Sequence, residues 1–435
     1  MMSASAVPRA CQNVTRALER APTRHRLLAL AAAWLLSRAL MLWLLAHNTR
    51  PLLGRGAVAR EVWKLYHHWY LVLSQGAFPA HDTLWQYPPG AGVVLLSPAL
   101  LPGLTYFQSF VVLTLAVDAV IAVALARAGT RRGRSLRGAG YWTLGLPLLL
   151  HVPLARYDVQ VTAFAVLSLL ALPRATRACG VFAGLGALVK VWPALALLGT
   201  PRGRTTRSSW TAAALTCAGA GLTLSLLFRN PLAFVRQQGG RGVQIESFGG
   251  TALSLATHAG WPGRVRYQYG ALEFTGPHVH AVAQLSLALS AAALGLLVLW
   301  RVRARRWTEA TPYDAALSAV LLFTVTSRVI SPQYMIWLLG LSAVCLTSPR
   351  TTQRPVAALV ALASLVSVIA YPTLYYEVAA CTWTGCALMV TRNVLLGSAA
   401  VLSMARLWRS TKLVARRREP STDAHRLPHG TPSPS

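Results

Sequence analysis

Acidic residues are scarce in this chain: 12 Asp and Glu stand against 42 Lys and Arg among 435 residues. Charged residues of both signs make up 12% of the sequence, whereas an average soluble domain carries roughly 25%. A soluble enzyme, a disordered tail protein and a disulfide-stapled secreted module are therefore excluded. The net charge of +30 alone would suggest a nucleic-acid binder, but apolar runs of about 18 or more residues recur along the chain. The remaining class is an all-α, multi-span integral membrane protein.

The sequence also lacks the motifs of metal and nucleotide sites. No G-x-G-x-x-G follows a strand, no Walker loop is present, and the six cysteines have no metal-ligand spacing. A cytosolic nucleotide-sugar domain is therefore disfavoured, and neither a metal nor another cofactor is expected. Cys381 and Cys386 lie in a short predicted outer loop, where they either form a disulfide on an oxidising membrane face or remain two small apolar residues.

Apolar runs bounded by helix breakers predict roughly ten full transmembrane helices. They lie near residues 27–46, 105–126, 140–153, 157–172, 210–228, 279–300, 313–328, 333–348, 356–375 and 387–408. Two shorter apolar stretches, 90–103 and 179–199, are interrupted by Gly, Pro or Lys. These stretches predict short or re-entrant helices, which are tolerated only where protein or a cavity surrounds the backbone.

Lysine and arginine are unevenly distributed along the chain, and this distribution predicts its orientation. Most of them fall into clusters at Arg9–Arg26, Arg127–Arg137, Arg174/Arg177, Arg202–Arg207, Arg301–Arg306, Arg350/Arg354 and Arg406–Arg426. The predicted spans place all of these clusters on one side, which the positive-inside rule makes cytoplasmic. We therefore expect a plasma-membrane protein with both termini inside.

Three regions follow from this topology. Residues 1–26 are predicted to be a basic cytoplasmic segment, residues 27–408 the transmembrane domain, and residues 409–435 a disordered basic tail. Two long segments, about 47–89 and 229–277, fall on the outer side. Both are rich in Trp, Tyr and Gly and contain charged residues, so we expect them to carry the function.

Because acids are few, each candidate base can be considered in turn. The carboxylates predicted outside or at the outer mouth of a span are Glu61, Asp82, Asp158, Glu246, Glu273 and Glu377. Asp118 lies near the middle of a span, where an unpaired charge is costly. Asp118 is expected to be protonated, to be functional, or to form an ion pair with one of the intramembrane bases Arg38, Lys190, Arg328 and Arg392.

The outer segment 61–102 combines residue types that an interfacial aromatic belt does not require. It begins with Glu61, continues through an aromatic run that contains His67 and His68, and reaches Tyr87-Pro88-Pro89 at the membrane surface. Aromatic residues alone are common at that depth. An acid, two histidines and a rigid Pro-Pro turn together favour a functional site.

These residues belong to a pattern that extends along most of the chain. In order, it comprises Glu61-Val62, Tyr66-His67, Trp69, Gly76–Pro79, Asp82, Trp85–Pro89, Arg156-Tyr157-Asp158, Gly186–Pro193, Arg241–Ser247, Tyr269-Gly270 with Glu273, Ser327–Tyr334 and Arg392-Asn393. Over about residues 27–408 the chain resembles glycosyltransferase family 87, which consists of integral-membrane transferases of the GT-C superfamily. The Tyr-Pro-Pro and Ser-Pro-Gln-Tyr segments are the most distinctive parts of this resemblance.

The resemblance implies a GT-C-like fold and a polyprenyl-phosphate sugar donor, typically carrying mannose. The sugar would be transferred on the outer face of the membrane to a cell-envelope glycan or glycolipid. The resemblance also implies an inverting mechanism with a base in the first outer loop. In such enzymes the base is usually an Asp; the aligned position here is Glu61, and Asp82 is the second candidate.

The chemistry of the residues agrees with this expectation. A carboxylate that takes the acceptor's proton contributes about 10²–10⁴-fold to the rate, and cations stabilise the charge that accumulates on a leaving phosphate. Lys190, Arg328 and Arg266 are candidate phosphate contacts, while His67 and His68 are candidates to hydrogen-bond the base or sugar hydroxyls. The other predicted substrate-binding residues are Tyr87, Arg156, Asp158, Glu246, Gln333, Tyr334 and Arg392. Membrane lipids are expected partners; nucleic acid is not.

A transporter or flippase of a lipid-linked sugar or another anionic substrate is the alternative. Transporters often have discontinuous helices at matching positions in two repeated halves. Here both interrupted stretches, 90–103 and 179–199, lie in the first half, and large outer segments are not typical of transporters.

Overall fold

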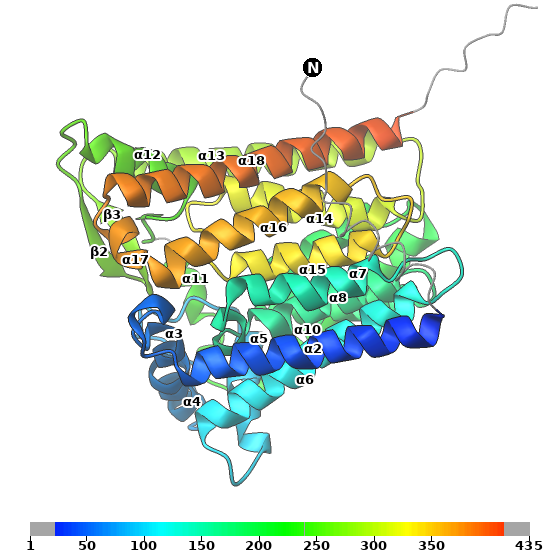
Figure 1. Cartoon of the computed structure of the whole chain (residues 1–435), viewed down its shortest axis with the longest axis horizontal. Coiled ribbons are helices and arrows are strands. Elements are labelled where there is room, and N and C mark those ends of the chain that lie inside the picture. Colours follow the sequence, from blue (N-terminus) through cyan, green and yellow to red (C-terminus); the bar gives the residue numbers. More distant parts are fainter. Residues whose placement is uncertain (1–21, 239, 413–435) are drawn as a thin grey trace, which may run out of the picture.

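Long apolar helices form the outside of a helix bundle in the computed structural model, which describes residues 22–238 and 240–412 (Figure 1). Six helices of this described part are long and apolar enough to cross a membrane: α2 (Thr23–Ala46), α6 (Tyr106–Gly129), α10 (Arg204–Leu227), α13 (Val279–Arg303), α16 (Arg354–Val368) continued by η7 (Ile369–Thr373), and α18 (Trp383–Thr411). On α2, α10 and α13 most side chains face outward, and many of the exposed ones are leucines. Such an apolar surface is suited to lipid rather than water, so the prediction of a mostly helical membrane protein is confirmed.

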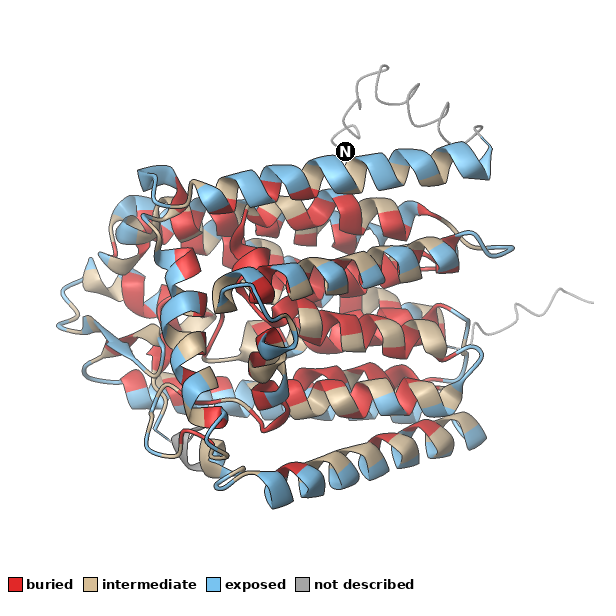
Figure 2. Cartoon of the chain, turned by 90° about the horizontal axis from the view of Figure 1, so that it is seen from below, coloured by how far each residue is buried: buried red, intermediate tan, exposed pale blue. Residues whose placement is uncertain are grey.

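Shorter helices fill the interior of the bundle, where Figure 2 shows the greatest concentration of buried residues. They are α5 (Gly90–Leu96), α7 (Arg137–Gly145), η4 (Leu146–Leu149), η5 (Val152–Ala155), α8 (Asp158–Ala171), α9 (Thr176–Val189), η6 (Trp192–Gly199), α14 (Thr311–Thr326) and α15 (Tyr334–Leu346). The short η3 (Ser97–Leu100) follows α5 and is exposed at Leu100. The predicted number of roughly ten full spans is not confirmed, because the spans predicted at 157–172, 313–328 and 333–348 are helices of only 13 to 16 residues.

Polar residues explain why these helices are short. Helix α8 begins at Asp158, α9 ends just before Lys190, and α14 ends just before Ser327 and Arg328. Irregular backbone at such positions is stable where it lines a polar cavity inside the protein. The helix ends therefore mark the level at which the candidate site enters the bundle.

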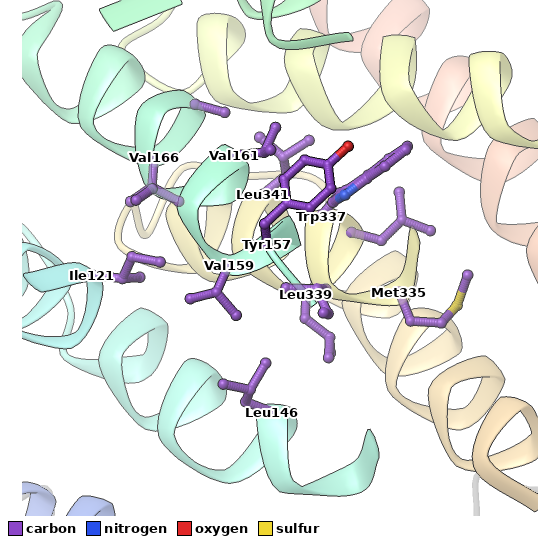
Figure 3. Packing of buried hydrophobic residues seen from close by; sticks show 14 of the residues in the cluster. Ile121, Leu146, Tyr157, Val159, Val161, Val166, Met335, Trp337, Leu339 and Leu341 are labelled. Carbon is purple, nitrogen blue, oxygen red and sulfur yellow. The ribbon is translucent and has the colours of Figure 1, made fainter. Parts of the chain in front are cut away.

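The central helices meet in one apolar core. In Figure 3, Ile121 of α6, Leu146 of η4, Val159 and Val166 of α8, and Leu339 of α15 surround the same space. Each of these side chains is at most 1% exposed. Full burial of an aliphatic side chain stabilises a fold by about 1.5–3 kcal/mol, so this cluster holds α8 and α15 rigidly behind the site.

Asp118 forms a structural ion pair, one of the alternatives left open by the sequence. Its Oδ2 and Oδ1 atoms lie 2.7 Å from Nε and 2.8 Å from Nη2 of Arg38. Trp34 and Trp142 donate their indole N–H groups to the same carboxylate at 2.9 and 2.7 Å. The pair links α2, α6 and α7, and every charge-bearing atom has a partner, as a buried ion pair requires.

The basic loops lie together at one end of the bundle. Arg134 Nη2 is 3.3 Å from Glu309 Oε2, the amide of Ser135 donates to the carbonyl of Thr347 at 2.9 Å, and Arg406 Nη1 donates to the carbonyl of Thr352 at 3.2 Å. These contacts join connections that are far apart in the sequence. Most of the predicted segment 1–26 and of the predicted tail 409–435 lies outside the described residues.

The two predicted outer segments lie at the opposite end, on the left of Figure 1, and both contain regular structure. The first contains η1 (Pro51–Leu53), α3 (Ala57–Arg60), η2 (Glu61–Tyr66) and α4 (His67–Leu73). The second contains α11 (Ala233–Gln238), α12 (Phe248–Thr257) and a three-stranded antiparallel sheet in the order β1 (Val243–Gln244), β3 (Ala271–Thr275), β2 (Arg264–Gln268). The fold is therefore not strictly all-α. Helix α17 (Tyr375–Ala379) lies at the same end, and Cys381 and Cys386 beside it are free thiols.

Candidate active site

A cavity of about 940 Å³ opens between the two outer segments; we call it the acid cavity because Glu61, Asp82 and Glu246 line it. One helical face of the first outer segment forms a wall, through Arg60, Glu61, Lys64 and His68. Glu61, Lys64 and His68 are spaced by three and four residues, which places their side chains on the same side of a helix. Arg156, Gln244, Tyr267, Gln333, Tyr371 and Tyr375 contribute to the opposite walls.

Glu61 is held by a buried arginine. Arg156 Nη2 lies 3.3 Å from Glu61 Oε2 and 3.1 Å from the hydroxyl of Tyr371. The other amino group of Arg156 donates to the backbone carbonyls of Val58 and Ala155. Arg156 is thus fixed by the backbone and orients the Glu61 carboxylate, which remains 25% exposed.

Asp82 is also oriented within the acid cavity. Its Oδ2 accepts the indole N–H of Trp69 at 2.7 Å, and its Oδ1 accepts the amide of Leu84 at 2.9 Å. Asp82 is therefore positioned by hydrogen bonds, and Glu61 by its ion pair with Arg156.

A second cavity of about 450 Å³, which we call the cationic cavity, is lined by Lys190, Arg241 and Arg328. Tyr87, Trp192, Tyr269, Tyr334 and Trp337 provide aromatic walls. Glu61 lines both cavities, together with Leu84, Gly270, Ala271, Ser331 and Gln333. The two cavities are therefore adjacent, and a carboxylate lies at their boundary.

Lys190 is held by charge and by aromatic rings. Its Nζ lies 2.5 Å from Asp158 Oδ1, and the indole N–H of Trp337 donates to the same oxygen at 2.7 Å. The ammonium group also lies 4.7 Å from the ring centroid of Tyr157 and 5.0 Å from that of Trp337, within the range of cation–π attraction. This environment keeps the cation in place against the wall of the cavity.

The neighbouring arginines are positioned by the second outer segment. Arg241 Nε lies 3.3 Å from Glu273 Oε1, and Arg328 Nη1 donates to the carbonyl of Arg241 at 2.9 Å.

Burial raises the pKa of the Tyr87 phenol above its ordinary value, and the negative charges of Glu61 and Asp158 raise it further. Tyr87 is thus a neutral hydrogen-bond donor at neutral pH.

Arg392 does not line the acid cavity but contacts Glu246, which does. Its Nη1 lies 2.7 Å from Glu246 Oε2, and the adjacent Asn393 donates to Thr251 Oγ1 at 2.7 Å. Burial raises the pKa of the Glu246 carboxyl, while the Arg392 guanidinium opposes that shift. The pair anchors the second outer segment to α18.

The structure separates the sequence-predicted site residues into three groups. Residues that line a cavity are Glu61, His68, Asp82, Tyr87, Arg156, Lys190, Glu246, Arg328, Gln333 and Tyr334. Asp158 and Arg392 contact such residues from behind. His67 instead lies against the rings of Tyr70 and Tyr106, and Arg266 is exposed on β2 outside the lining of both cavities.

Sequence reasoning missed several lining residues. Arg241 carried a signal, because it begins the Arg241–Ser247 motif, but it was not singled out among the outer arginines. Tyr371 and Tyr375 follow a long apolar run and resemble an interfacial belt, so only their position in space brings them to the acid cavity.

No group of three or more His, Cys, Asp or Glu side chains suited to a metal ion occurs within residues 22–238 and 240–412. Two oriented carboxylates beside a cluster of lysine and arginine can instead combine proton acceptance with stabilisation of a developing anion. This chemistry fits the transfer of a group from a phosphate.

Comparison with known families agrees with that chemistry. The model of glycosyltransferase family 87 matches residues 85–332, more than half of the chain. The protein belongs to glycosyltransferase family 87. The region matched to family 87 includes Arg156, Lys190 and Arg328, whereas Glu61 and Asp82 lie before it. No curated protein and no solved structure matches the chain.

Membership of family 87, together with the apolar helices, indicates a multi-pass membrane glycosyltransferase. The enzyme would use a sugar donor and an acceptor, and the two adjacent cavities offer a place for each.

Proposed function

We propose that the protein transfers a sugar, with mannose as the first candidate, from a polyprenyl-phosphate donor to a glycan or glycolipid acceptor. The observation that carries the proposal is the order of three adjacent cavities. The acid cavity adjoins the cationic cavity, which in turn shares Leu287, Ser290 and Phe323 with an apolar groove of about 280 Å³ between α13, α14 and η6. The acid cavity has three carboxylates beside Arg60, Lys64 and Arg156, the cationic cavity has three cations beside Glu61, and the groove is apolar. This order suits an acceptor, a phosphate and an isoprenoid chain.

In the proposed reaction the donor phosphate occupies the cationic cavity. Lys190, Arg241 and Arg328 would neutralise the charge that develops on the phosphate as the sugar–oxygen bond breaks. The isoprenoid chain would continue into the apolar groove, where burial of each CH₂ contributes about 0.8 kcal/mol. The sugar would then point toward the junction of the two cavities.

Glu61 is the proposed base because it lies at that junction. The acceptor hydroxyl would enter from the acid cavity, lose its proton to Glu61 and attack the anomeric carbon opposite the phosphate, with inversion of configuration. Arg156 holds one oxygen of Glu61 at 3.3 Å and thereby orients the carboxylate. Asp82 lines the acid cavity but not the cationic cavity. This position suits a contact with acceptor hydroxyls.

Orientation follows from the basic loops, which gather at the end of the bundle opposite the cavities. The positive-inside rule supports a cytoplasmic position for that end, with both termini inside the cell. The acid cavity would then open on the outer face of the plasma membrane, where a lipid-linked sugar and a cell-envelope acceptor can meet.

The test is transfer of radiolabelled sugar from a polyprenyl-phosphate donor by purified protein in proteoliposomes. Glu61→Gln should lower transfer by about 10²-fold or more, the contribution of a general base, in protein that is still folded. Glu377→Gln is the matched control, since Glu377 lies at the same end of the molecule but pairs with Thr382 outside the cavities.

Other outcomes would revise the proposal in defined ways. Full activity of Glu61→Gln together with loss in Asp82→Asn would move the base to Asp82. Activity in both variants would exclude a base in the first outer segment. Sugar flux across the membrane without a glycosidic product would favour a transporter.

A further inference from the structure

The hairpin of β2 and β3 ends at the boundary between the two polar cavities. Gln268 pairs with Ala271, so Tyr269 and Gly270 form a two-residue turn. Gly270 and Ala271 line both cavities, Tyr267 lines the acid cavity, and Tyr269 lines the cationic cavity. The tip of the hairpin is therefore a partition with one tyrosine on each side.

Tyr269 has an unusual backbone conformation. Its φ is +50° and that of Gly270 is +77°, so both residues of the turn have positive φ, as in type I′ hairpins, which strongly prefer Asn, Asp or Gly. A bulky aromatic residue is an outlier there. Tyrosine is thus a poor choice for the turn itself, which points to a use for its side chain.

The turn also separates the two tyrosines. Tyr267 belongs to strand β2, where residues two apart point to the same face, whereas Tyr269 lies beyond the end of β2 in the turn. The positive φ of Tyr269 ends the alternation of the strand, so the two rings need not share a face. Space for the phenol is provided by Gly240, where a Cβ would collide with the Tyr269 hydroxyl.

We infer that Tyr269 is a donor-site residue whose ring packs against the head group of the donor. Tyr267, on the other side of the hairpin tip, contacts the acceptor. The inference rests on the proposed function and assigns the two sides of the hairpin tip to the two substrates. Flat aromatic rings pack well against the apolar faces of sugars and beside phosphates held by arginine, and Arg241 and Arg328 line the same cavity as Tyr269.

Substitution by Asn separates this role from a structural one, because the two roles predict opposite changes. Tyr269→Asn places a preferred residue in the turn, so the melting temperature should be unchanged or higher. The KM for the donor should nevertheless rise about tenfold, the effect of losing roughly 1.4 kcal/mol of contact, with the acceptor KM changing less than twofold. Tyr269→Phe, which keeps the ring, should restore the donor KM.

Tyr267→Asn is the matched variant on the other side of the partition. It should raise the acceptor KM and leave the donor KM unchanged. A donor KM of Tyr269→Asn equal to that of the wild type, a lower melting temperature of that variant, or failure of Tyr269→Phe to restore the donor KM would each overturn the inference.

Direct binding keeps this test independent of the transfer assay. Thermal stabilisation of the wild type by farnesyl phosphate should exceed that of Tyr269→Asn, because a ligand stabilises a protein according to its affinity. If the wild type transfers no sugar, the proposed function fails, and equal stabilisation of both proteins would then overturn the present inference separately. Absence of any stabilisation in the wild type would overturn both.

Discussion

Asp118 and Glu61 are both carboxylates that face an arginine, but their surroundings give them different roles. Asp118 is 1% exposed and accepts bonds from Arg38 and two tryptophans. Glu61 is 25% exposed and lies where two cavities meet. A carboxylate enclosed by donors is not accessible to a substrate, whereas Glu61 can reach one. Burial and number of partners, not residue type, therefore distinguish structural from reactive acids here.

The structural role of Asp118 can be tested by its removal. Asp118→Ala leaves the Arg38 guanidinium buried without its counter-charge, which typically costs about 3–5 kcal/mol. We expect a large fall in the melting temperature of the protein in detergent. Glu309→Ala, which breaks the more exposed pair with Arg134, should cost less than about 1 kcal/mol. Equal shifts in the two variants would contradict this assignment.

At the scale of elements, close contact between α9 and α10 depends on small residues. Gly180 and Gly184 face α10, and a Cβ at Gly180 would collide with the carbonyl oxygen of Ser209. Helices approach this closely in membranes because small residues let their backbones come together. The Gly180/Gly184 spacing is typical of such packing, and both glycines lie against α10. The position of α9 matters for the site because Lys190 follows its last turn.

Opposite effects are expected from two glycine substitutions in this helix pair. Gly180→Ala should destabilise the protein by about 1–3 kcal/mol, because the extra methyl group forces the helices apart. Gly219→Ala on α10 meets open space and should be neutral or stabilise by up to about 1 kcal/mol, because alanine favours helix. Melting temperatures in detergent measure both changes. A stable Gly180→Ala variant would show that the two helices are free to separate.

At the scale of the whole molecule, adjacent cavities line the proposed path from the outer segments to the apolar groove. The groove lies along α13, an otherwise lipid-facing helix, so a long isoprenoid chain would enter from the side. Two outer segments far apart in the sequence close the other end of the path. Short central helices leave the polar middle open.

This path predicts an effect that depends on chain length. Ala291 lines the apolar groove, whereas the adjacent Ala292 of α13 is exposed outside it. Ala291→Trp should raise the KM for a long-chain polyprenyl-phosphate donor about tenfold, since excluding two CH₂ groups from the groove costs about 1.6 kcal/mol. A donor with two isoprene units should be affected less, and Ala292→Trp should behave as the wild type. The assay compares initial rates with both donors; an equal effect on both would place the chain elsewhere.

Sequence patterns located long helices well and the site only in part. Residues 105–126 and 279–300 were predicted as spans, and the helices cover Tyr106–Gly129 and Val279–Arg303. The stretch 179–199 was predicted as one interrupted element but divides into α9 and η6 around Lys190. Hydropathy averages over many residues and therefore detects a long helix better than a short one ended by a single charge.

The sequence by itself determined the class of the protein, its approximate helices and the family pattern, because hydropathy and motifs are local properties. Only the tertiary structure decided which charges meet. Glu61 contacts Arg156, and Glu246 contacts Arg392, across long stretches of chain. The tertiary structure also places Arg241 at the cationic cavity and leaves Arg266 exposed. Such pairings depend on how helices pack and on which face each residue occupies, and no local pattern records those distances.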